Sequence, residues 1–278
     1  MASGDGLVVR VRPQGGRLTQ AQALGTADLD RTHGNGLIDL SNRANVQLRG
    51  VTEASHPPLI DGLRALGLID QSPEVESRRN IIVTPLWATD DATQALAAEL
   101  THALAAKDAP ALPAKFGFVI DTATPCLRDV AADIWIETGP AGVLLATAHG
   151  AKPVSAQTAV AEAIGLARWF IAQGGVTEGR GRMAQLLARV PLPQGFTAAR
   201  APASVPQIGP QPQGQLVGFE FGQMQAETLA ELARHGAVRV TPWRMLLVET
   251  ATPLPKIDGV IDRADDPMLR VIACSGAP

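Results

Sequence analysis

Arginines and amide side chains alternate with apolar residues between Gly36 and Gly50. In an extended strand, neighbouring side chains point to opposite faces, so this stretch predicts a strand with one polar and one apolar face. The polar row consists of Asp39, Ser41, Arg43, Asn45, Gln47 and Arg49. Arginine can grip a carboxylate or phosphate through two parallel hydrogen bonds, so the row could bind an anion. A hydrated sheet face explains any single alternating strand more simply, so the choice depends on the rest of the chain.

Arg10 and Arg12 belong to a second alternating stretch, which predicts a strand from Leu7 to Val11. Side chains two residues apart on a strand are about 6.6–6.8 Å apart, a spacing that suits the separate carboxylates of a flat polyanion. Taken together, the two stretches favour a ligand over simple hydration. Asp39 is a candidate acid or base only through its place in the row, and an arginine partner would explain it equally well.

A β-α-β unit carries these residues, and a similar unit recurs about 200 residues later. The first comprises the strand at Leu7–Val11, a helix capped by Thr19 that ends near His33, and the strand at Gly36–Gly50. The second comprises a strand at Gln215–Phe221, a helix at Ala226–His235 and a strand at Ala237–Glu249. The chain therefore predicts an α+β fold in which two duplicated ferredoxin-like β-α-β halves pair around other α+β domains.

The middle of the chain predicts an α+β block, followed by a proline-rich segment with little room for helix. Its expected helices are 59–68, 89–107 (capped by Thr89), 155–173 and 182–190, and its expected strands are 80–85, 115–121, 133–137 and 143–147. We expect the domains to be 1–68 (first half), 69–190 (α+β domain), 191–213 (linker), 214–256 (second half) and 257–278 (start of a further domain). Gly174-Gly175 and Gly179-Arg180-Gly181 are expected to be flexible loops.

Composition limits the class of protein. Apolar residues make up 46% and charged residues 18% of the 278 residues, as in globular domains. A net charge of −3 argues against a general nucleic-acid or membrane-surface binder. The chain contains no apolar run long enough to span a bilayer and no recognisable signal peptide at its N-terminus, so we expect a cytoplasmic protein with neither nucleic acid nor membrane as partner.

Four motifs occur in order at suitable spacing: Leu7–Gly16, Ser41–Gln47, Arg79-Asn80 and Leu112–Phe116. This series resembles the nitrite and sulfite reductase superfamily, and within it the precorrin-3B synthases of aerobic cobalamin biosynthesis. Ser-x-Arg-Ala-Asn at Ser41 and Thr-Pro-Trp-Arg at Thr241 are similar to the synthases, whereas the reductases usually have Thr-x-Arg-Gln at the first position. The resemblance covers practically the whole chain.

The resemblance implies a tetrapyrrole site and assigns residues to it. The implied binding residues are Arg10, Arg12, Ser41, Arg43, Asn45, Gln47, Arg49, Arg79, Asn80 and Lys115. In the reductases a second lysine follows two residues after the position of Lys115, but here that position is Gly117. A missing cation argues against reduction of a bound anion such as nitrite or sulfite.

The resemblance also implies a [4Fe–4S] cluster and iron, with Cys274 as the first cluster ligand. Cys126 matches no ligand motif, and we interpret it as a structural thiol. Since the chain ends four residues after Cys274, it cannot complete a cluster as given. We therefore expect it to be a fragment, with a naturally truncated product as the alternative.

The function implied is that of an oxidoreductase of the precorrin-3B synthase type. Such a monooxygenase-like enzyme uses O₂ and an electron donor to hydroxylate precorrin-3A with lactone formation. One alternative is a sirohaem-dependent nitrite or sulfite reductase, which would bind haem. Another is a non-catalytic tetrapyrrole-binding protein or inactive fragment. The sequence identifies no catalytic acid or base.

Overall fold

The computed structural model describes residues 2–122, 124, 126–139, 142–197, 200 and 203–271. These residues form two compact units. The first contains the residues up to Asp70 and those from Gln207 onward, and the second contains Gln71–Pro206. The two ends of the chain therefore fold into one unit, with the middle of the chain inserted as the other.

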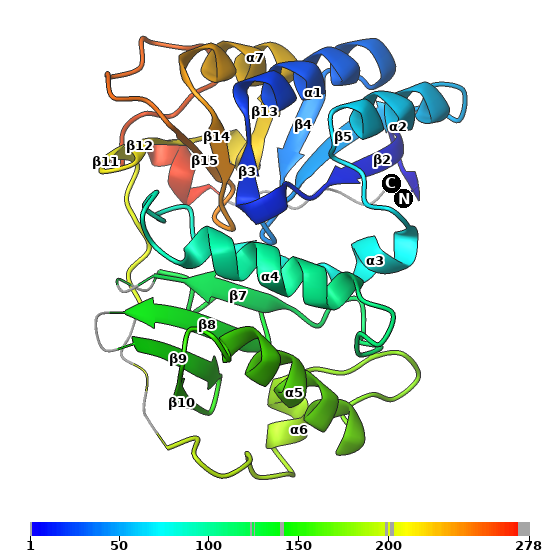
Figure 1. Ribbon diagram of the computed structural model, residues 1–278. Coiled ribbons are helices and arrows are strands. Elements are labelled where there is room, and N and C mark those ends of the chain that lie inside the picture. The colour runs from blue at the N-terminus through cyan, green and yellow to red at the C-terminus, as the bar shows by residue number, and fades with distance from the viewer. Residues whose placement is uncertain are drawn as a thin grey trace. The chain divides into compact units, whose positions relative to one another are not determined.

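The first unit contains two repeats with the same order of elements (Figure 1). The first repeat consists of β2 (Gly6–Val11), the 3₁₀ turn η1 (Gln14–Gly16), β3 (Arg17–Leu18), α1 (Gln20–His33), β4 (Leu37–Leu40) and β5 (Val46–Val51). The second consists of β12 (Gly214–Gly218), η2 (Glu220–Gly222), β13 (Gln223–Gln225), α7 (Ala226–His235), β14 (Val238–Val240) and β15 (Met245–Val248). The remaining elements of the unit are β1 (Ala2–Ser3), α2 (His56–Ala65), β11 (Gly209–Gln211) and η3 (Pro267–Arg270). The predicted duplication is confirmed.

Each repeat gives one short strand to the sheet of the other. The two antiparallel sheets have the orders β1-β2-β5-β4-β13 and β11-β12-β15-β14-β3. Thus β13, which precedes α7 in the second repeat, pairs with β4 of the first, and β3 pairs with β14. The repeats cannot separate without breaking both sheets, so the first unit is a single folded body.

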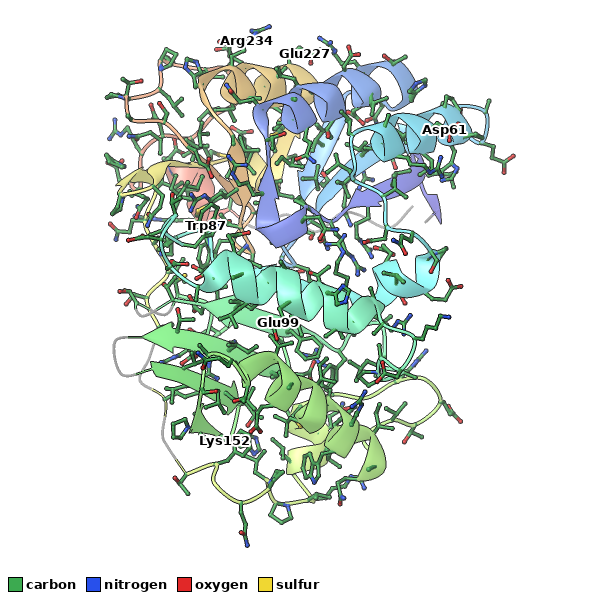
Figure 2. The ribbon with its side chains drawn as sticks, in the orientation of Figure 1. Asp61, Trp87, Glu99, Lys152, Glu227 and Arg234 are labelled. Carbon is green, nitrogen blue, oxygen red and sulfur yellow. The ribbon has the colours of Figure 1, made fainter. Side chains whose placement is uncertain are left out.

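Helix α1 begins where the sequence predicted. The Thr19 hydroxyl accepts the Gln22 N–H, and the Gln22 side chain accepts the Thr19 N–H, a reciprocal capping box. Helix α1 packs against both α2 and α7 (Figure 1). Charged side chains such as Glu227 and Arg234 lie on α7 (Figure 2). Among the described helices, none combines the length and apolar character needed to cross a membrane.

The prediction of one continuous strand over Gly36–Gly50 is wrong, because the chain reverses at Ser41 and forms the β4–β5 hairpin. The Ser41 hydroxyl accepts the N–H groups of Arg43 and Asn45, and Ala44 adopts a left-handed backbone with φ of 53°. The strand predicted over 237–249 is likewise a hairpin, of β14 and β15, whose left-handed residue is Arg244.

The second unit is built on one five-stranded sheet of order β10-β9-β8-β7-β6. Its strands are β6 (Ile81–Val83), β7 (Phe118–Asp121), β8 (Ile134–Gly139), β9 (Gly142–Thr147) and β10 (Gly150–Val154). Its helices are α3 (Pro73–Arg78), α4 (Thr93–Ala105), α5 (Ala159–Ala172) and α6 (Met183–Leu187). Strands β6, β7 and β8 are parallel, and the other pairs are antiparallel. Phe116, Phe118 and Phe170 form the centre of the core.

Helices α3 and α4 of this unit differ from the prediction. Helix α4 begins at Thr93 rather than after Thr89, because the Asp91 carboxylate accepts the Thr93 N–H. Helix α3, which follows the cap Ser72, was not predicted. In the proline-rich segment, Arg200 bonds to the buried Glu137, so this part of the segment is anchored.

Candidate functional site

A row of four polar side chains crosses the first sheet of the first unit. The strand registers pair Arg10 with Gln47, Gln47 with Asp39, and Asp39 with Gln223. Residues paired directly across strands project to the same face, so all four lie in one line. The opposite face is apolar and buried, with Leu48 and Ile38 fully inaccessible. The sheet therefore has a half-buried polar face, as predicted, but the row runs across the strands rather than along one of them.

The Asp39 side chain accepts hydrogen bonds from two partners, Gln223 in this row and Arg49 on β5. Its Oδ2 accepts a hydrogen bond from Arg49 Nη1 at 2.8 Å, and its Oδ1 accepts one from Gln223 Nε2 at 2.7 Å. Arg49 also binds Asp5 through two bonds of 2.9 Å. Hydrogen bonds to Asp5 and then to Asp39 raise the pKa of Arg49. Arg49 thus bridges two carboxylates, and Asp39 has the arginine partner that explains it without catalysis.

The predicted residues Ser41, Arg43 and Asn45 lie in the β4–β5 turn. Pairing of Val11 with Val46 brings Arg12, the next residue after β2, opposite Asn45. Asn45 is only 5% exposed, whereas the arginines are partly exposed. The structure therefore gathers this group at one end of the sheet, beside the row that contains Arg10 and Gln47.

The second repeat provides an internal comparison, because its strands have the same registers. Leu216 pairs with Leu247, Leu247 lies next to Arg239, and Arg239 pairs with Arg17. Leu216 and Leu247 therefore occupy the places of Arg10 and Gln47, and both are fully buried. The second sheet therefore has buried apolar side chains at the two places where the first sheet presents Arg10 and Gln47, while Arg239 and Arg17 keep the rest of the row polar.

The ion pair between Asp39 and Arg49 recurs in the second repeat with its acidic and basic residues exchanged. Arg239 stands where the first repeat has Asp39, and Glu249 stands where it has Arg49. Glu249 Oε1 accepts from Arg239 Nε at 2.7 Å, and the same carboxylate receives two bonds from Arg17. Although burial opposes it, bonding to these arginines gives a net lowering of the pKa of Glu249.

Arg79, Asn80 and Lys115 lie in the second unit, at the amino ends of the parallel strands β6 and β7. The Asn80 side chain donates to the backbone carbonyl of Phe116 at 3.0 Å, and the backbone carbonyl of Asn80 accepts the Phe118 N–H. Arg79 is 6% exposed and Lys115 is exposed. The structure brings these three predicted residues to the same edge of one sheet.

Gly117 stands at that edge without room for a side chain. A Cβ atom on Gly117 would lie 2.9 Å from Asn80 Nδ2, and the backbone N–H of Gly117 donates to the buried Asp133 carboxylate at 2.9 Å. A lysine at this position would have to displace Asn80. The absence of the second basic residue is therefore built into the packing of the edge.

The two cysteines of the chain were predicted to be a structural thiol, Cys126, and a cluster ligand, Cys274. Cys126 is buried, and burial, followed by the neighbouring Asp121 charge, raises its pKa to about 12, so it remains a neutral thiol. Cys274 lies outside the described residues. Within the described part of the chain, no group of three or more His, Cys, Asp or Glu side chains is placed to hold a metal.

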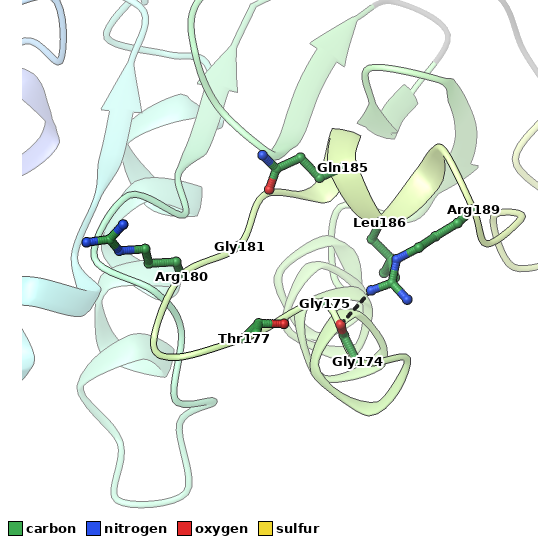
Figure 3. Close-up of a pocket in the computed structure, with 8 residues that line it drawn as sticks. All are labelled: Gly174, Gly175, Thr177, Arg180, Gly181, Gln185, Leu186 and Arg189. Carbon is green, nitrogen blue, oxygen red and sulfur yellow. Dashed lines mark hydrogen bonds between the residues drawn. The ribbon is translucent and has the colours of Figure 1, made fainter.

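A hollow of about 190 Å³ lies between the end of α5 and helix α6 (Figure 3). It is bordered by the glycine segment that sequence analysis treated as flexible. Instead, Thr177 and Arg180 exchange backbone hydrogen bonds, and a Cβ on Gly181 would lie 1.9 Å from the Gly175 carbonyl. Arg189 donates to Gly174, while the Arg180 side chain points away from it (Figure 3). These side chains do not converge on a common ligand position.

Gln223 is a residue of the candidate site that sequence reasoning missed. It belongs to the second repeat but pairs with β4 of the first. The alternating stretch around Gln223 is only three residues long, too short to predict a strand from sequence. Its partner in the first repeat, Asp39, lies 184 positions away in the chain. The equivalent position in the first repeat, Arg17, is exchanged in the same way, so the duplication itself is the signal that could have located Gln223.

Comparison with known proteins agrees with this architecture. The sequence model described as "Nitrite/Sulfite reductase ferredoxin-like half domain" matches residues 1–66. A precorrin-3B synthase from Sinorhizobium sp is 30% identical over 313 aligned positions, which cover 100% of this chain and 67% of the relative. A chloroplastic ferredoxin–nitrite reductase from Zea mays is 33% identical over 84 residues, covering 30% of this chain and 15% of the relative.

Among solved structures, the NirA protein of Mycobacterium tuberculosis shares the fold. Its TM-score is 0.66 at 18% sequence identity, with 97% of this chain and 60% of the NirA chain covered. The chain thus spans about two thirds of the length of the synthase relative and less of NirA. The matched fraction includes both units described above.

Proposed function

The chain belongs to the precorrin-3B synthase family of the nitrite/sulfite reductase superfamily, and we propose that its first repeat binds a metal-free tetrapyrrole polycarboxylate as substrate. The observation that carries this proposal is the contrast between the repeats. Arg10 and Gln47 present a half-buried polar face where the second sheet has the buried Leu216 and Leu247. The acetate and propionate groups of a precorrin need several fixed donors, which this face offers.

The proposed reaction is the O₂-dependent hydroxylation of precorrin-3A with lactone formation, as expected for an oxidoreductase of this family. One oxygen atom enters the macrocycle and the other leaves as water, so an electron donor is needed as a partner. The described residues do not fit a [4Fe–4S] cluster, because Cys126 is a buried neutral thiol without companions. The part that these residues play is to bind and orient the substrate.

Gly117 supports the synthase over a sirohaem-dependent reductase. Reduction of nitrite or sulfite requires positive charge beside the bound anion. A second lysine near Lys115 would bring a Cβ to 2.9 Å from the Asn80 amide and force that side chain to move. We propose that Arg79 and Lys115, at this same edge of the sheet, bind carboxylates of the substrate.

Binding of uroporphyrin III, a fluorescent metal-free tetrapyrrole polycarboxylate, tests the proposal. Loss of one charge-assisted hydrogen bond costs about 1.5–3 kcal/mol, so Arg10→Ala or Arg43→Ala should raise the Kd about tenfold or more. Arg64→Ala is the matched control, because Arg64 lies exposed on α2 in an ion pair with Asp61. Coproporphyrin III, which lacks the acetate carboxyls, should bind more weakly than uroporphyrin III.

The comparison between variants separates a specific site from general attraction to arginine. Equal Kd values for the parent protein, Arg10→Ala and Arg43→Ala would refute the proposed ligand face. An equal loss in Arg64→Ala would show that binding depends only on net charge, and would refute it as well.

A further inference from the structure

Two non-glycine residues with left-handed backbones touch in the second repeat. Phe221 has φ of 55° and Arg244 has φ of 61°, and the Arg244 Nη1 atom donates to the Phe221 carbonyl at 3.2 Å. In this region the Cβ of an L-residue crowds its own backbone, so large side chains are uncommon there. Such outliers persist where the surrounding structure over-determines them, and they cluster at active sites and ligand-binding sites.

The first repeat shows that the fold does not require large side chains at these places. The equivalent of Phe221 in η1 is Gly15, with φ of 59°, and the equivalent of Arg244 in the β4–β5 turn is Ala44. Both turns therefore form with glycine and alanine. Phe221 is also 37% exposed, so its ring is not needed to fill the core.

The position of Phe221 links it to the candidate site. It lies two residues before Gln223, the last member of the polar row, which corresponds to about 7 Å along an extended chain. Strand β4 runs antiparallel to β13, so η2 adjoins the end of β4 at which the Ser41 turn begins. The aromatic ring thus belongs to the same end of the unit as the predicted binding turn.

We propose that Phe221 and Arg244 extend the ligand face, with the ring stacking on the conjugated macrocycle and the guanidinium pairing with a peripheral carboxylate. A flat conjugated polyanion is the ligand class that uses both groups at once. This inference rests on the proposed function and adds to it a contact from the second repeat. The second repeat then contributes to the site from a turn, although its own sheet has buried leucines at the places of Arg10 and Gln47.

Phe221→Gly tests the inference, because the same change removes the ring and relieves the backbone. We expect a higher urea midpoint of unfolding than in the parent, together with about tenfold weaker binding of uroporphyrin III. Phe221→Leu keeps an apolar side chain without a ring and should also weaken binding. Leu24→Ala is the matched control: Leu24 is 38% exposed on α1, and its loss should leave the Kd unchanged.

The outcomes distinguish this inference from the function on which it rests. Parent-like binding by Phe221→Gly and Phe221→Leu, with weakened binding by Arg10→Ala, would overturn the stacking contact and leave the ligand face intact. No binding of uroporphyrin III to the parent protein would overturn both. An equal loss in Leu24→Ala would assign the effect to general apolar surface and overturn the contact.

Discussion

Replacing Asp30 by asparagine should stabilise the protein at alkaline pH and leave it nearly unchanged at acidic pH. Asp30 is fully buried in α1, and no donor among the described residues lies in good hydrogen-bond geometry with either carboxyl oxygen. Burial, followed by the negative charge of Glu227 on α7, raises its pKa from 3.8 to about 7. The backbone amide of Arg49 acts in the opposite direction but does not offset burial.

The sign follows from proton linkage. The folded state holds the Asp30 proton up to about pH 7, whereas an unfolded aspartate releases it near pH 3.8. The unfolded state therefore binds fewer protons between these values, and the free energy of unfolding falls as the pH rises through this window. At 1.36 kcal/mol per pH unit the loss is at most about 4 kcal/mol.

Urea unfolding followed by circular dichroism from pH 5 to pH 8 measures this loss. The parent should lose stability toward pH 8 more steeply than Asp30→Asn, which cannot ionise. Asp28→Asn is the control, because Asp28 lies exposed on the same helix in an ion pair with Arg31. If the parent and Asp30→Asn show the same pH dependence over this range, the assignment of a neutral buried acid is refuted.

Two further predictions concern the edge that holds Gly117. Gly117→Ala should lower the free energy of unfolding by about 1–3 kcal/mol, because its methyl group would meet Asn80 Nδ2 at 2.9 Å. Gly165→Ala is the control, since Gly165 lies in open space on α5, and it should raise the free energy of unfolding by about 0.5–1 kcal/mol. Thermal unfolding measures both changes, and equal shifts in the two variants would contradict the packing at Gly117. Asp133→Asn should cost about 3 kcal/mol, since Asp133 is buried, binds Arg182 at 2.9 Å and accepts the N–H groups of Gly117 and Met183; a urea midpoint like that of the parent would refute this.

Local chemistry made much of the fold predictable from sequence. The Thr19 cap, the helix that follows it and the repeated order of elements depend on residues close together in the chain, and all are confirmed. The apolar face of the first sheet was predicted from the alternation that Leu48 and Ile38 share. Short-range patterns of this kind are preserved whatever the rest of the molecule does.

The hairpin was missed because its turn preserves the alternation. Five residues, 41–45, separate β4 from β5, so Asp39 and Gln47 remain an even number of positions apart and stay on one face. Parity alone therefore cannot distinguish one long strand from two paired ones. Ser41 and the amides around it are turn-forming residues, and giving them more weight would have located the reversal.

Comparison of the two repeats distinguishes polar residues that the fold needs from polar residues that we assign to ligand binding. Exchange of Asp39 and Arg49 for Arg239 and Glu249 preserves the ion pair while reversing both charges, as expected if only its contribution to the fold matters. By contrast, buried leucines stand at the places of Arg10 and Gln47 in the second repeat, so the duplicated sheet accepts apolar side chains there. We therefore propose that Arg10 and Gln47 are kept for ligand binding, and for this reason the binding test begins with Arg10 rather than with Arg49.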